Sequence, residues 1–66
     1  MKYYYLYTQL DTFIGAIKGE EYATFGEAKG AAADLISRNP LYKVEIWLFN
    51  EGENTLLEKL ENTQSP

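Results

Sequence analysis

The sequence predicts a small α+β fold, in which one helix packs on one face of a small antiparallel sheet in the order ββαββ. Three observations predict it. Residues 25–38 have a capping box at their start and Asn-Pro at their end, which indicates a helix. Residues 42–50 alternate and are rich in β-branched and aromatic side chains. Residues 2–10 are rich in tyrosine and contain neither Gly nor Pro, which favours a strand.

The first hairpin is predicted from residues 2–10 and 13–18, joined by a turn at Leu10-Asp11-Thr12. Gly15 within the second run indicates a bulge or a close approach of the helix. Lys18-Gly19-Glu20 is expected to end the second strand.

The helix over residues 25–38 has clear signals at both ends. Thr24 stands at the N-cap, and Glu27 follows three residues later, which completes the capping box. Asn39 and Pro40 end the helix, because the residue before a proline avoids helical backbone angles. One apolar stripe has helical spacing and consists of Phe25, Ala28, Ala32, Leu35 and Ile36. Because alanine dominates this stripe, we expect the helix to lie close against the sheet.

The second hairpin is predicted from residues 42–50, a turn at 50–54 and a last element over 55–61. As a strand, the last element pairs back on residues 42–50, which otherwise lack a local partner. As a helix, it has a capping box of its own from Thr55 to Glu58. The strand is the preferred interpretation, and the helix stays open. We expect residues 1–62 to form a single domain and residues 63–66 to form a flexible tail.

The composition excludes several kinds of chemistry. The 66 residues include no cysteine and no histidine, so disulfides, thiolate zinc sites and Ser–His or Cys–His nucleophiles are impossible. Asn50–Glu61 has the length of a calcium loop, but Thr55 occupies the position that requires glycine. No glycine spacing fits a phosphate-binding loop. We therefore expect no enzymatic activity, no metal and no cofactor.

Hydropathy and charge limit the compartment and the partners that we expect for this protein. No apolar run approaches the ~20 residues of a membrane span, and the N-terminus lacks the apolar core of a signal peptide, so we expect a cytoplasmic protein without a membrane partner. Ten acidic and six basic residues give a net charge of −4. The basic residues are spread along the chain, which argues against binding nucleic acid through its phosphates.

The face that the helix leaves uncovered is the predicted working surface. Three aliphatic residues share one face of the strand over 42–50: Val44, Ile46 and Leu48. This row is expected under the helix, which puts Trp47 and Phe49 on the opposite face. If Tyr4 and Leu6 also pack under the helix, the other tyrosines of the first strand join them there. The predicted contact surface is aromatic and consists of Tyr3, Tyr5, Tyr7, Trp47 and Phe49.

Several functions are compatible with such a surface. The first is contact with a larger protein, together with homodimerisation through the aromatic face or an exposed sheet edge. The second is acidic mimicry of nucleic acid, which would use four carboxylates of the last third of the chain: Glu51, Glu53, Glu58 and Glu61. The third is stacking of single-stranded nucleic acid on the aromatic rings. A purely structural role for cross-strand aromatic pairs is the alternative to all three.

The tyrosine-rich hairpin followed by the helix start T-x-x-E-A, Thr24 to Ala28, resembles the opening of HicB-type antitoxins over about half of the chain. The proline- and glycine-rich segment expected before the helix in that type is missing. The same features look like small accessory proteins of phages and mobile elements. The resemblance implies a non-enzymatic regulator or inhibitor.

Overall fold

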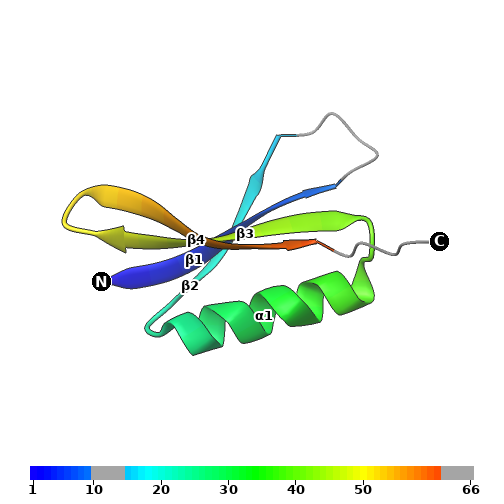
Figure 1. Cartoon of the computed structure of the whole chain (residues 1–66), viewed down its shortest axis with the longest axis horizontal. Helices are drawn as coiled ribbons and strands as arrows, with labels where there is room; N and C mark the ends of the chain where they lie inside the picture. Colours follow the sequence, from blue (N-terminus) through cyan, green and yellow to red (C-terminus); the bar gives the residue numbers. More distant parts are fainter. Residues whose placement is uncertain (10–14, 62–66) are drawn as a thin grey trace.

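The computed structural model describes residues 1–9 and 15–61 and confirms the predicted α+β fold. Its elements, in chain order, are β1 (Lys2–Gln9), β2 (Ile17–Tyr22), α1 (Phe25–Arg38), β3 (Tyr42–Asn50) and β4 (Glu53–Glu61). The strands form one antiparallel sheet in the order β2-β1-β3-β4, and α1 lies along one face of it (Figure 1). The predicted turn at residues 10–12 and the predicted tail at 63–66 lie outside the described residues.

The last element of the fold is a strand, as preferred, and it pairs with β3 along its length. Glu51 and Gly52 connect the two strands and have φ angles of 51° and 81°. Positive φ at both central residues is typical of the type I′ turn, whose twist suits a tight hairpin. The register shifts between Ile46 and Trp47, which leaves Leu57 as an extra residue in β4.

The position predicted for the second strand was wrong. Gly15 and Ala16 precede β2, which begins at Ile17 and continues through Gly19 to Tyr22, while residues 13 and 14 lie outside the described residues. The reason is the ring of Tyr5 on β1, which lies directly over Gly19, where a Cβ atom would overlap it. Gly19 therefore permits a close approach inside the strand instead of ending it.

Helix α1 has the predicted bounds. The Glu27 amide donates to Thr24 Oγ1 at 3.2 Å, and the Thr24 hydroxyl donates to Glu27 Oε1 at 3.0 Å. The Glu27 carboxylate thus reaches back to the cap through the hydroxyl. At the other end, the Asn39 amide donates to the carbonyls of Leu35 and Ile36, at 2.9 and 3.2 Å. These bonds use groups that the helix ends would otherwise leave without partners.

The centre of the core lies between α1 and β3. Its four fully buried residues are Ala28, Ala32, Val44 and Ile46. The two alanines let the helix backbone approach the sheet, and the two branched side chains of β3 fill the space beneath them. The prediction that the aliphatic row of β3 faces the helix is thereby confirmed for Val44 and Ile46.

The face predicted for Tyr3, Tyr5 and Tyr7 was wrong, because these side chains lie on the helix side of the sheet. Tyr5 is opposite Ile46 and Tyr7 is opposite Val44, and directly paired residues of antiparallel strands share a face. The physical reason is the alanine face of α1, which is too thin to cover the sheet. Aromatic rings fill the remaining space.

The rings on the helix side contact one another in pairs. Tyr5 stacks on Tyr22 with 6.4 Å between ring centroids, and Tyr7 stacks on Tyr42 with 5.3 Å. Tyr3 packs edge-on against Phe25 of α1, with 6.3 Å between centroids. The tyrosines of β1 on this side therefore extend the small core across the sheet.

Tyr5 is expected to titrate at higher pH than an exposed tyrosine. Burial, followed by the neighbouring phenols of Tyr22 and Tyr7, raises the pKa of Tyr5 above its usual value of 10.0. Because the pKa is raised in the folded state, the stability that it contributes is complete below pH 10 and is lost as pH rises through the folded pKa. Absorbance titration of the wild type and of Tyr5→Phe checks this: the difference should be the late-titrating phenol. If the phenol that is lost in Tyr5→Phe titrates at the pH of an exposed tyrosine, the burial of Tyr5 is contradicted.

Candidate protein-interaction surface

The sheet face opposite α1, here called the open face, carries a row of apolar side chains across three strands. Tyr4 of β1 is opposite Trp47 of β3, and Trp47 is opposite Leu56 of β4. The apolar centre of the open face consists of Tyr4, Leu6, Trp47, Phe49 and Leu56. In the described part of the chain, α1 covers only the other face (Figure 1).

Tyr4 is held firmly although no helix covers it. Its hydroxyl donates to Asn54 Oδ1 at 2.6 Å, which ties β1 to β4 across β3. The Lys18 ammonium lies 4.9 Å from the ring centroid, in position for a cation–π contact. These neighbours leave the side chain only 9% exposed. Tyr4 therefore provides a fixed aromatic ring against which a partner's side chain can pack on the open face.

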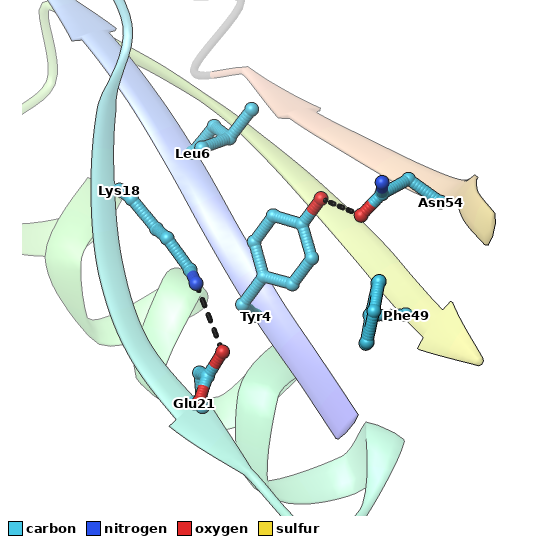
Figure 2. Close-up of a pocket in the computed structure, with 6 residues that line it drawn as sticks. All are labelled: Tyr4, Leu6, Lys18, Glu21, Phe49 and Asn54. Atoms are coloured by element: carbon cyan, nitrogen blue, oxygen red, sulfur yellow. Dashed lines mark hydrogen bonds and ion pairs between the residues drawn. The ribbon is translucent and has the colours of Figure 1, made fainter. Parts of the chain in front are cut away.

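A depression of about 350 Å³ surrounds this tyrosine. It is lined by Tyr4, Leu6, Lys18, Glu21, Phe49 and Asn54. Figure 2 shows the ring of Tyr4 in the middle, with Phe49 on one side and the Lys18–Glu21 ion pair on the other. Apolar walls with polar groups at the ends suit a single apolar side chain from a partner.

The Glu21 carboxylate pairs with two lysines at this end of the open face. Lys18 Nζ lies 2.9 Å from Glu21 Oε2, and Lys2 Nζ lies 3.5 Å from Oε1. The hydrogen bond from Lys18, with the charges of both lysines, lowers the pKa of the Glu21 carboxyl. All three groups are exposed, so they are accessible to a partner but add little stability.

The other end of the open face also carries charges of both signs. Lys43 of β3 is opposite Glu61 of β4, and Glu45 is opposite Lys59. The indole N–H of Trp47 donates to Glu45 Oε1 at 3.3 Å. Each lysine at this end therefore has a carboxylate directly opposite it. The rim of the open face is mixed in sign and does not form a basic patch.

The predicted contact residues are divided between the two faces. Trp47 and Phe49 lie on the open face, as expected, whereas the three tyrosines do not. Sequence reasoning missed Tyr4, which was assigned to the core, and Leu56, whose element was ambiguous. Because the extra residue at Leu57 reverses the alternation in β4, no simple pattern identifies Leu56.

The structure does not bring the four carboxylates proposed for nucleic-acid mimicry onto one surface. Glu51 and Glu53 lie at the β3–β4 turn, and Glu61 lies at the opposite end of β4. Glu58 points to the helix side, where Lys29 Nζ of α1 is 3.2 Å from its Oε2 atom. The group therefore spans both ends and both faces of the strand.

Across residues 1–9 and 15–61, no cluster of three His, Cys, Asp or Glu side chains could hold a metal ion. The same residues include no helix with the length and apolarity needed to cross a bilayer. Comparison with protein-family models, curated proteins and solved structures finds no match for this chain. The functional proposal therefore rests on the geometry of the open face.

The bond between Tyr4 and Asn54 is expected to contribute measurably to stability. Tyr4→Phe removes the donor and should lower the free energy of unfolding by about 1 kcal/mol. Urea unfolding of Tyr4→Phe, Asn54→Ala and the double variant measures the coupling between the two side chains. Strictly additive losses would show that the bond contributes nothing.

Proposed function

We propose that this chain is a small non-catalytic protein-interaction module that binds a larger protein through its open face and regulates or inhibits it. One observation carries the proposal: Trp47, Phe49 and Leu56 lie together on a face that no described element covers. Phe49 and Leu56 are 39% and 38% exposed, so both side chains can contact a partner. Aromatic groups of this kind dominate the energetics of protein interfaces.

The charges around the apolar centre favour a protein partner over nucleic acid. Interfaces between proteins have an apolar centre and a polar rim of mixed sign, which is the pattern on the open face. Phosphate binding instead requires lysines without carboxylate partners. Here Lys18 is bonded to Glu21, and Lys59 is opposite Glu45.

The test is capture of partners from host-cell lysate at low and at raised salt. We compare the wild type with Phe49→Ser/Leu56→Ser, in which both replaced side chains are already partly exposed. Leu41→Ser is the matched control, because Leu41 is an exposed apolar residue outside the sheet. The expected result is a partner that binds the wild type and the control at both salt concentrations and is lost with the double variant.

Two results would overturn the proposal. A partner that is released by salt and binds the double variant normally would favour recognition through charge, as in nucleic-acid mimicry. Retarded migration of a single-stranded oligonucleotide, abolished by the same variant, would assign the open face to nucleic acid.

A further inference from the structure

The outer edge of β4 is a second surface suited to pairing. β4 is at one edge of the sheet, so the outward N–H and C=O groups of its nine residues face no other strand of the described chain. Exposed edges of this length tend to pair with another strand, and β4 contains neither the proline nor the glycine that would discourage pairing. The opposite edge, β2, is shorter, with six residues, and its register with β1 shifts between the partners of Tyr4 and Leu6.

An apolar groove lies beside the C-terminal part of this edge. It encloses about 370 Å³ and is lined by Ala33, Ile36, Ser37, Leu60 and Glu61. Figure 1 shows this end of β4 above the C-terminal half of α1. A strand added to the edge would cover the groove with its helix-side side chains. Edge pairing and apolar burial would therefore occur together.

We propose that the added strand is β4 of a second copy, paired antiparallel about a twofold axis at Leu60. In one continuous sheet, directly opposite residues share a face, so the axis must pass through a residue. The extra residue at Leu57 interrupts the strand, which leaves the segment Glu58–Glu61 for regular pairing. An axis at Glu58, Lys59 or Glu61 would set that charged residue against its own copy.

The axis at Leu60 gives complementary contacts for the last three described residues of the strand, Lys59–Glu61. Leu60 of one copy is opposite Leu60 of the other, next to the two apolar grooves. Lys59 is opposite Glu61 of the second copy, and the symmetry repeats this pair. The charges of the strand thus favour self-association in this one register.

This dimer goes beyond the proposed function, because it uses the edge of β4, with Lys59 and Glu61 at the rim of the open face, and leaves the apolar centre of that face uncovered. A twofold axis perpendicular to the sheet places the open faces of both copies on the same side. The assembly would present two copies of the contact surface to a partner with two sites, which strengthens binding without new contacts.

Two single charge reversals test the register. In Lys59→Glu and in Glu61→Lys, both interchain charge pairs become repulsive, and each variant alone should dimerise about tenfold more weakly than the wild type. An equimolar mixture of the two should recover dimerisation, because a heterodimer again pairs opposite charges. Sedimentation equilibrium measures the association. Circular dichroism of each variant checks its fold, which mixing does not change.

Any of three results on the edge itself would overturn the proposal: a wild type that stays monomeric at about 1 mM, single variants that dimerise like the wild type, or a mixture that does not recover. Phe49→Ser/Leu56→Ser should dimerise normally. If that variant loses the dimer, the open face is the dimer interface. Failure of the edge proposal can thus be separated from failure of the proposed function, which the lysate experiment measures on the open face alone.

Discussion

Replacing Ile46 with alanine is expected to remove a large share of the free energy of unfolding. Ile46 is fully buried at the centre of β3, beneath the alanine face of α1. Removing such a side chain costs about 2–5 kcal/mol, because apolar contacts are lost and a cavity remains. A domain of 66 residues has a total stability on the order of 3–10 kcal/mol. Urea unfolding followed by far-UV circular dichroism gives the loss directly.

Ile17→Ala is the matched control for this prediction. It deletes the same atoms from a side chain that is 45% exposed on the edge strand β2. Its cost should stay below about 1 kcal/mol, since much of the side chain is already in water. Equal losses in the two variants would show that the core is not centred on Ile46.

The elements that the sequence predicted best are those with local signals. The cap at Thr24 and the stop at Asn39-Pro40 involve residues within a few positions of one another, so both ends of α1 were predicted correctly. The aliphatic alternation of residues 42–50 likewise predicted β3 and the face that it buries. In these segments, local preference and tertiary packing agree.

The faces of β1 could not be predicted, because both of its rows are apolar. The choice between Tyr4 and Tyr5 as the helix-side residue depends on the register with β3, which is a long-range property. Leu6 was expected on the helix side, with the aliphatic row of β3. That expectation did not take into account that a helix lined with alanine covers little of the sheet. Neither the register shift between β1 and β2 opposite Tyr5 nor the extra residue at Leu57 could be located from local sequence.

The aromatic character of the open face was predicted from the sequence, but only some of its residues were. An apolar, aromatic open face exists, and Trp47 and Phe49 are on it. Tyr4 replaces the three predicted tyrosines, and its bond to Asn54 makes it a support for the surface. Half of the tyrosine-rich strand thus builds the core under α1, and the other half shapes the opposite face.

Alanine is expected to have opposite effects at two glycines, Gly19 and Gly30. At Gly30, in the middle of α1, no atom outside the helix lies within 4 Å of an added Cβ, so Gly30→Ala should stabilise the fold by up to about 1 kcal/mol. At Gly19, the added Cβ would overlap the Tyr5 ring. Urea unfolding of both variants measures the two changes.

The ring of Tyr5 cannot move away freely, because it stacks on Tyr22 and contacts Tyr7 at 6.0 Å between centroids. We therefore expect Gly19→Ala to cost about 1–3 kcal/mol, as overpacking of a filled core does. If the ring is displaced towards water, its phenol should also lose its late titration, since burial is the main cause of the raised pKa. Stabilisation by both alanines would mean that Tyr5 does not cover Gly19. If only Gly19→Ala lowers the free energy of unfolding, glycine is required at this position because of a side chain on the neighbouring strand. The local sequence Lys18-Gly19-Glu20 cannot predict such a requirement.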